Sequence, residues 1–597
     1  MTAGTMELLV IAVLALLAIA GAAAIGPKLG VASPLLLVIV GIGVSLLPEV
    51  PPFEVDPEWI IAGVLPPLLY SAAVSMPTME FRRDFTAISG LSVVLVLITS
   101  VLLGLLFTWL IPDLGLAMGI ALGAILSPTD AVATSIVKRL GVSPRVSALL
   151  DGESLLNDAS ALVLLRAAIA GAAASVALWG VVGTFVYSVA VAGVIGAIVG
   201  WLNLRIRARV SNPTVNTVIS FTMPFIASIP AEQLGASGLV AAVVAGLITG
   251  RGAARYLSPQ HRLSDVQTWR TVELVLEGAV FLVMGLQLSG IVDEVESAHE
   301  GVWAAIRIAA IAFAAAILIR AAYVAPLLAA LGRRARRGAA FKQRLVDRAG
   351  PPTTSRPPSR VPDPSPAQAE RFRTMMRRRV ADIDYYLDEA LGWREGTIVV
   401  WAGMRGVVTL AAAQTLPADT PSRSMLVLIA FVVAVGSLLV QGGTLPWLVR
   451  WLLPVRDAGD TVAERLELKR VLHTAAFDEL DGDDSLDPRL RATAERMRAA
   501  WLTSADEGAQ ESGEYAGETP ASGARTDSDV AEPGHGTSDR LIDAEQVRML
   551  RLRMIRAERD ALLDARDEGT FGAAALGAAL EELDAEQISI ELKGPGE

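Results

Sequence analysis

The chain has 597 residues, of which 53% are hydrophobic, 19% are charged and none is cysteine. Its mean hydropathy is +0.49, so it carries more apolar surface than a soluble protein of this length could bury. The lack of cysteine excludes disulfides, thiol redox chemistry and zinc–thiolate sites. Apolar runs such as 87–111 and 176–201 exceed the roughly 18 residues of a membrane-spanning helix. The composition predicts an all-α polytopic membrane protein.

Apolar runs and loop charges together predict about thirteen transmembrane helices. The first run, 6–25, lacks the basic leading segment of a signal peptide and is interpreted as the first span. Basic and acidic connections alternate along the chain, and the positive-inside rule assigns the basic ones to the cytoplasm. We therefore expect the N-terminus outside and the C-terminus in the cytoplasm of a multi-pass plasma-membrane protein.

Two predicted spans contain residues that interrupt helices. The fifth, about 115–137, contains Pro128, which has no N–H group and crowds the preceding turn. The twelfth, about 397–417, contains Gly403 and Gly406, which make unwinding cheap. Because the two spans are seven apart, they cross the membrane in opposite directions, as inverted-repeat secondary transporters require. Proline and glycine are also simply common in membrane helices, but a charged residue in each break favours the functional interpretation.

A transmembrane domain is expected over 1–455, interrupted by a long basic cytoplasmic loop at 332–396. The basic arms of this loop are expected at the anionic inner leaflet, and its proline-rich middle is expected to lack structure. A cytosolic tail is predicted over 456–597. It is interpreted either as a binding site for a regulatory partner or as a solvated appendage.

The tail shows helical periodicity in three segments and a composition typical of disorder between two of them. The four histidines all fall in predicted loops or in the tail, so no histidine metal site or histidine proton relay is expected within the membrane. The helical segments are 461–480, 486–503 and 540–566, the disordered stretch is about 504–539, and the histidines are His261, His299, His473 and His535.

The sixth predicted span, about 146–170, carries a compact patch of oxygen-bearing side chains. Glu153 and Asn157 are four residues apart, as are Ser154 and Asp158, so all four project from one side of the helix. Carboxylate, hydroxyl and backbone oxygens suit a hard monovalent cation, whereas dedicated divalent sites usually gather more carboxylates. If the fifth helix breaks opposite this patch, its free carbonyls can join it. That break would add Thr129 and Asp130.

Asp158 is the candidate ion carrier. Desolvation disfavours the charged form of a lone carboxylate at membrane depth, so either a proton or a cation is needed to neutralise it. If only the neutralised site can cross, one group exchanges the two ions in opposite directions. The alternative is a structural Asp158 that caps a helix or pairs with an arginine, which would not explain the neighbouring polar residues.

Two arginines lie within apolar segments and need partners there. Glu153 is the first expected partner of Arg320; alternatively, Arg320 extends its side chain to the cytoplasmic interface. Arg405 is expected to neutralise the carbonyl ends of the broken helices, or to pair with Asp130 or Glu277.

Six stretches of the chain carry a recognisable pattern and occur in a fixed order. They are LPPLLYSAA at 65–73, ILSPTDAVATS at 125–135, LLDGESLLNDASALVL at 149–164, SGLVAAVVAGL at 237–247, FLVMGLQL at 281–288 and WAGMRGVVTLAAA at 401–413. Together they resemble the sodium/proton exchangers of the monovalent cation:proton antiporter-1 family, which includes NhaP-type and NHE-type exchangers. The resemblance covers roughly 1–455, and GESLLND with its upstream SPTDA is its most specific part.

The resemblance implies an NhaA-like antiporter fold with two broken crossing helices, a homodimer, and exchange of Na⁺ (or K⁺ or Li⁺) for a proton in pH homeostasis. It implies that Asp158 carries both ions while neighbouring residues shape the site. The Asn157–Asp158 pair is similar to that of electroneutral members, which implies one cation per proton, and Asn157 cannot ionise. The implied shaping residues are Thr129, Asp130, Glu153 and Ser154, and the implied cation ligands are Asp158, Ser154 and Thr129.

Some positions depart from the family pattern. Trp269-Arg270 and Leu276-Glu277-Gly278 stand where the family often shows a Trp-Glu pair and a turn that contains asparagine. The loop 332–396 is unusually long. These departures affect local pairing and regulation and leave the ion site itself intact.

Other functions remain open. One is a K⁺ efflux or channel-like member of the same superfamily, although the tail has no glycine-rich nucleotide-binding fingerprint. Another is a non-transporting sensor or scaffold that acts through its tail. An enzyme is not expected, because no nucleophile–base arrangement and no P-loop is visible, and neither a cofactor nor a nucleic-acid partner is implied. The sequence does not distinguish Na⁺ from K⁺ or Li⁺.

Overall fold

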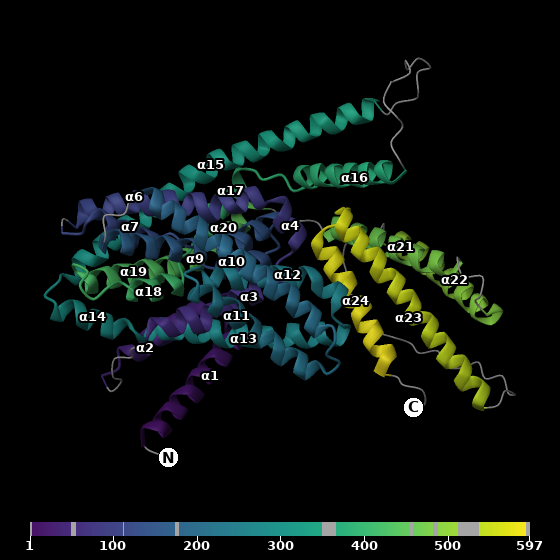
Figure 1. The fold of residues 1–597 in the computed structure, drawn as a ribbon, viewed down its shortest axis with the longest axis horizontal. Coiled ribbons are helices and arrows are strands. Elements are labelled where there is room, and N and C mark those ends of the chain that lie inside the picture. The colour runs from purple at the N-terminus through teal and green to yellow at the C-terminus, as the bar shows by residue number, and fades with distance from the viewer. Residues whose placement is uncertain are drawn as a thin grey trace. The chain divides into compact units, whose positions relative to one another are not determined.

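The computed structural model describes residues 3–48, 55–111, 113–173, 178–348, 366–453, 458–481, 487–511 and 537–592. These ranges contain α-helices and three short π-helical segments, and no strand lies in any of them (Figure 1). Nine of the helices in these ranges are long and apolar enough to cross a membrane, and three shorter apolar helices accompany them. The all-α, multi-pass membrane class is confirmed, whereas the count of thirteen spans stays a prediction.

The chain divides into two compact units, Met1–Arg456 and Asp457–Glu597. Within the first unit, one set of helices forms what we call the first bundle. Here α3 and α10 pack along α12, α2 packs along α13, and α11 contacts both α12 and α13. Its members are α1 (Ala3–Leu29), α2 (Ser33–Ser45), the π-helical η1 (Trp59–Val64), α3 (Leu65–Ser75), α10 (Leu178–Arg207), α11 (Pro213–Gln233), α12 (Gly238–Tyr256) and α13 (Pro259–Leu286).

The remaining membrane helices form the second bundle, in which α7 packs between α6 and α9, and α15 packs against α17 and α19. Its members are α4 (Thr78–Arg83), α5 (Phe85–Ser89), η2 (Gly90–Val94), α6 (Leu95–Leu110), α7 (Leu116–Leu126), α8 (Val132–Arg139), α9 (Pro144–Ala173), α15 (Val302–Arg348), α17 (Trp393–Trp401), α18 (Val407–Gln414), α19 (Arg423–Ser437), η3 (Leu438–Gly442) and α20 (Gly443–Leu452). The short α14 (Leu288–Ser297) connects the bundles and contacts helices of both.

Both predicted helix breaks are confirmed. The fifth span is divided into α7 and α8 around Pro128, and the twelfth into α17 and α18 around Gly403 and Gly406. The two breaks meet, because the backbone N–H of Asp130 donates a hydrogen bond of 2.7 Å to the carbonyl of Met404. The peptide groups that each broken helix leaves unpaired are thus partly satisfied by the other break.

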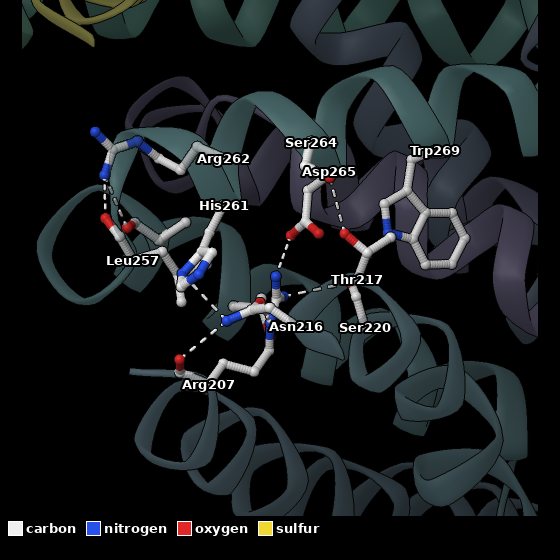
Figure 2. A network of polar contacts seen from close by, with 12 residues as sticks. Arg207, Asn216, Thr217, Ser220, Leu257, His261, Arg262, Ser264, Asp265 and Trp269 are labelled. Atoms are coloured by element: carbon white, nitrogen blue, oxygen red, sulfur yellow. Dashed lines mark hydrogen bonds and ion pairs between the residues drawn. The ribbon is translucent and has the colours of Figure 1, made fainter. Parts of the chain in front are cut away.

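A buried polar network ties three helices of the first bundle together (Figure 2). Arg207, near the end of α10, is fully buried and donates to Asn216 and Ser220 of α11, at 2.5 and 3.3 Å. It also forms an ion pair with Asp265 of α13. The indole N–H of Trp269 donates to Ser220 at 3.1 Å. Because a buried guanidinium is costly without a partner, this network fixes α10, α11 and α13 relative to one another.

His261 belongs to this region as well, and the prediction that it lies in a loop is wrong. It lies in the first turn of α13, is 6% exposed, and its Nδ1 is 3.2 Å from the amide nitrogen of Asn216. The helix begins earlier than expected because Ser258 caps it, accepting a hydrogen bond from the backbone N–H of His261, and Pro259 occupies its first position. The Ser-Pro pair was the sequence signal for this start.

The loop predicted over 332–396 begins as a direct continuation of α15, which runs to Arg348, and returns as α16 (Pro366–Asp388). Its proline-rich middle lies outside the described residues. The returning segment docks on the second bundle: Asp382 forms an ion pair with Arg83 at 2.6 Å, and Tyr386 donates to the carbonyl of Arg83 at 2.5 Å. The loop is therefore partly folded and fastened to the bundle beside it.

A second ion pair in this region is more buried than the pair of Asp382 with Arg83. Arg145, in the first turn of α9, pairs with Asp84 at 2.9 Å, and their side chains are 3% and 1% exposed. Arg145 also donates to the carbonyl of Glu389 at 2.9 Å, and Tyr385 donates to Asp84 at 3.2 Å. Burial and the nearby carboxylates of Asp84 and Glu80 raise the pKa of Tyr385 above its ordinary value, so its hydroxyl stays protonated and available as a donor.

The second unit consists of α21 (Ala458–Asp481), α22 (Pro488–Glu511), α23 (Thr537–Glu568) and α24 (Ala573–Leu592). The three helical segments predicted in the tail correspond to the first three of these. Sequence reasoning missed α24, although its buried residues Ala575, Leu576, Ala579 and Leu583 recur at helical spacing. In the stretch expected to be disordered, 504–511 belong to α22 and 537–539 to α23, and the intervening residues lie outside the described ranges.

We predict that Arg145→Ala lowers the thermal stability of the detergent-purified protein strongly. It leaves the buried carboxylate of Asp84 without its cation, which costs about 3–5 kcal/mol. The control is Arg166→Ala, which removes an exposed pair with Glu232 whose side chains are 57% and 41% exposed, and which should change stability by less than about 1 kcal/mol. Equal melting temperatures for the two variants would contradict the prediction.

Candidate functional site

A cavity of about 330 Å³ lies between the two bundles. The second bundle contributes Asp130, Asp158 and residues 406–409 to its lining, and the first bundle contributes Glu273 and Glu277 from α13. Carboxylates thus reach the cavity from both sides. Sequence reasoning missed Glu273, although it lies one helical turn before Glu277 in the same apolar segment.

Asp158 and Ser154, on α9, both line this cavity, whereas Asn157 lies behind it. Asn157 is 1% exposed, and its amide nitrogen donates to the side-chain and backbone oxygens of Thr129, at 2.8 and 3.3 Å. Ser154 donates to the carbonyl of Asp151 at 3.1 Å. The structure therefore brings the oxygen-rich face of α9 against the break between α7 and α8, and Asn157 holds the two together.

Glu153 and Arg320 form a two-pronged ion pair, the pairing expected first from the sequence. Nη2 lies 2.8 Å from Oε2, Nη1 donates to Oε1, and the side chains are 3% and 2% exposed for Arg320 and Glu153 respectively. Arg320 also donates to the carbonyl of Val399 at 3.0 Å, and Thr129 donates to Glu153 at 3.2 Å. The alternative that Arg320 extends to the membrane interface is wrong, because its guanidinium is buried and is bonded to Glu153 and to the carbonyl of Val399. The negative charge of Glu153 is therefore neutralised by Arg320.

Arg405 lies in the break between α17 and α18, and its guanidinium donates hydrogen bonds to backbone carbonyls. Its Nε donates to the carbonyl of Leu126 at 3.0 Å and its Nη1 to that of Gly403, while its backbone N–H donates to Ser437 at 2.8 Å. No ion pair of Arg405 with Asp130 or with Glu277 is present in the described part of the chain, so that alternative is wrong. The guanidinium instead compensates the negative carbonyl ends of the broken helices α7 and α17.

The two glycines of the break between α17 and α18 lie so close to charged side chains that no Cβ atom fits there. A Cβ atom on Gly406 would lie 1.9 Å from Oδ2 of Asp130, and one on Gly403 would lie 2.7 Å from Cδ of Arg320. Oδ1 of Asp130 accepts from the N–H of Val132 at 3.3 Å. Its Oδ2 is buried and has no hydrogen-bond partner among the described residues. One carboxylate oxygen is therefore left unused beside the cavity.

The transmembrane sodium/hydrogen exchanger family model matches residues 12–451 of the chain. The chain belongs to this family. The match covers all six stretches on which the resemblance was based, and the resemblance is confirmed.

Two similar exchangers illustrate the relationship. The exchanger YjcE of Escherichia coli (strain K12), described as an uncharacterized Na⁺/H⁺ exchanger, is 38% identical over 40% of this chain and 45% of its own length. The exchanger Rv2287 of Mycobacterium tuberculosis, described in the same words, is 28% identical over 79% of this chain and 80% of its own length.

The family fold is also seen in a solved structure. The sodium proton antiporter MjNhaP1 from Methanocaldococcus jannaschii superposes with a TM-score of 0.54 at 17% sequence identity, over 75% of this chain and 99% of that protein. At this identity the likeness concerns the fold alone.

We predict that the losses of stability caused by Glu153→Ala and Arg320→Ala are not additive. Each single variant leaves one buried charge unpaired, at a cost of about 3–5 kcal/mol, whereas the double variant removes both charges. The double variant should therefore melt no lower than the worse single variant. The control is the more exposed pair Lys342–Asp384, with side chains 38% exposed each, for which small, additive effects are expected. Additive losses at Glu153 and Arg320 would contradict the assignment.

Proposed function

We propose that this protein is a secondary transporter that exchanges a monovalent cation, Na⁺ first and K⁺ or Li⁺ as alternatives, for a proton. Cation and proton compete for the carboxylate of Asp158. The observation that carries the proposal is the difference between the two carboxylates on α9. Glu153 is neutralised by Arg320, while Asp158, five residues further, lines the cavity and has no ion pair among the described residues.

This arrangement supports antiport by a single group. A carboxylate removed from bulk water is stable there only when a proton or a cation neutralises it. Asp158 can hold one of them at a time, so transport of one ion in one direction alternates with transport of the other. Asn157 beside it cannot ionise, which supports a ratio of one cation to one proton.

The chemistry of the lining favours a monovalent cation. Among the polar residues that line the cavity are Asp130, Asp158, Ser154 and Thr129, whose carboxylate and hydroxyl oxygens are of the kind that hard cations prefer. No cluster of three or more His, Asp or Glu side chains suited to a metal is found among the residues that the structure describes. The proposed ligands are Asp158, Ser154 and Thr129, with Asp130 and Glu153 shaping the site and Asn157 positioning the break.

The position of the cavity supports alternating access. Its lining also includes Ser75, Lys138 and Asp151, and the positive-inside rule assigns Lys138 to the cytoplasmic side. The cavity would then be open to the cytoplasm. Because it lies at the boundary between the bundles, movement of the second bundle against the first would carry Asp158 toward the other side.

We also propose that the protein works as a homodimer in the plasma membrane, with its N-terminus outside and its C-terminus in the cytoplasm. Family membership and the alternating loop charges support this setting. The second unit would then be cytosolic and available to a regulatory partner.

We predict that Asp158→Asn abolishes exchange. In proteoliposomes with an imposed pH gradient, added Na⁺ or K⁺ should dissipate the gradient with the wild type, without a compensating charge pathway, and should have no effect with the variant. Glu232→Gln, which changes an exposed carboxylate outside the cavity lining, is the matched control and should retain exchange.

Each other outcome is informative. Normal exchange by Asp158→Asn would show that another group carries the ions. Cation movement that needs a compensating charge pathway would favour a K⁺ efflux or channel-like protein. A wild type that moves no monovalent cation would favour the sensor or scaffold.

We predict further that protons on the cation side act as competitive inhibitors. When the pH on that side is lowered through the range in which Asp158 is mostly protonated, the half-saturating cation concentration should rise about tenfold per pH unit. The maximal rate at saturating cation should stay constant. Initial rates measured over a grid of pH and Na⁺ concentration test this, and a falling maximal rate with constant half-saturation would refute competition at one group.

A further inference from the structure

Two buried threonines of the cavity lining are not part of the ligand set proposed above. Thr134 is the third residue of α8 and Thr409 is the third residue of α18, so they occupy equivalent positions after the two helix breaks. Both line the cavity together with Asp130 and Asp158. They are 3% and 1% exposed, and the Oγ1 atom of each lacks a hydrogen-bond partner within the described ranges.

This situation is unusual for threonine in a helix. A helical threonine normally donates its hydroxyl to a carbonyl three or four residues earlier, as Thr108 and Thr268 do in this chain, at 2.9 and 2.7 Å. A buried hydroxyl without a partner loses its hydration without compensation. Such a group in a functional cavity therefore calls for a ligand.

The breaks affect both of the usual acceptors. The carbonyls three positions before Thr134 and Thr409, those of Ala131 and Gly406, accept from the backbone N–H of the same threonines, at 3.0 and 3.2 Å. The residues four positions before Thr134 and Thr409 are Asp130 and Arg405, and each lies within a break, before its half-helix begins. The carbonyl of Arg405 accepts instead from Ser437, at 3.3 Å. The same feature that divides each helix thus leaves one hydroxyl free at the start of the following half-helix.

We propose that Thr134 and Thr409 are direct ligands of the transported monovalent cation, one from each crossing helix, beside the carboxylates of Asp130 and Asp158. The inference rests on the proposed function and extends its ligand set. A hydroxyl oxygen offers two lone pairs and no charge, so it replaces water around a hard cation without adding another carboxylate. Asp130, whose Oδ2 has no hydrogen-bond partner among the described residues, lines the same cavity and completes a set that draws on both breaks.

The proposal separates cation binding from proton binding. Asp158 takes up a proton without help from the threonines, so removal of a hydroxyl weakens only the cation. Thr409→Val and Thr134→Val keep the shape of the side chain and remove the oxygen. Each should raise the half-saturating Na⁺ concentration about tenfold, with an unchanged maximal rate and an unchanged proton affinity.

The experiment compares these variants with Thr409→Ser and Thr134→Ser, which retain the hydroxyl and should bind Na⁺ like the wild type. Thr415→Val, at the C-cap of α18, is the matched control, because that hydroxyl is already bonded to the carbonyl of Ala412, and it should have no effect on Na⁺ affinity. Exchange in proteoliposomes gives the half-saturating concentration. Stabilisation of the full-length protein in detergent against heat, titrated with NaCl and compared with choline chloride, gives a binding readout that needs no transport.

The outcomes are distinguishable. Unchanged Na⁺ midpoints in both valine variants overturn the inference while the proposed function stands. A lower maximal rate with an unchanged midpoint shows a structural role of the hydroxyls and also overturns it. A wild type that shows neither exchange nor Na⁺-dependent stabilisation refutes the proposed function itself. If a valine variant yields no folded protein, the alanine and serine variants at the same position make the same comparison.

Discussion

The structure depends on the crossing of two broken helices. A break in a buried helix exposes peptide groups that lipid cannot satisfy, and here each break lies against the other. The N–H of Asp130 donates to the carbonyl of Met404, and Arg405 donates to the carbonyls of Leu126 and Gly403. Once the backbone is compensated in this way, carboxylates can stand beside the crossing and bind ions.

The two arginines at the crossing have partners in the protein, whereas the carboxylate of Asp158 has no ion pair among the described residues. Arg320 is committed to Glu153 and to the carbonyl of Val399, and Arg405 is committed to backbone carbonyls. Both cations therefore stabilise the framework, and neither neutralises Asp158. The close approach of Asp130 to Gly406 belongs to the same framework, since any larger residue there would meet the carboxylate.

Much of this site could be predicted from the sequence. Pro128, Gly403 and Gly406 have local effects on helices, so the breaks were predictable, and the burial of Glu153 and Arg320 required partners. The free hydroxyls of Thr134 and Thr409 were not predictable in the same way. Whether a threonine finds its usual acceptor depends on where each half-helix begins, and this start is fixed by tertiary contacts between the breaks. The partner of Arg405 was left open for the same reason.

The long loop shows the same limit of local reasoning and leads to a mechanical consequence. Its basic composition predicted arms at the membrane surface, which stays a prediction, and gave no sign that Asp382 and Tyr386 bind Arg83 or that Tyr385 and Glu389 extend the buried pair of Asp84 with Arg145. All these partners belong to the second bundle. Arg145 lies on the same helix as Asp158, thirteen residues earlier, or about 20 Å along its axis. In any movement of one bundle against the other, the folded part of the loop therefore travels with the helix that carries the proposed ion site.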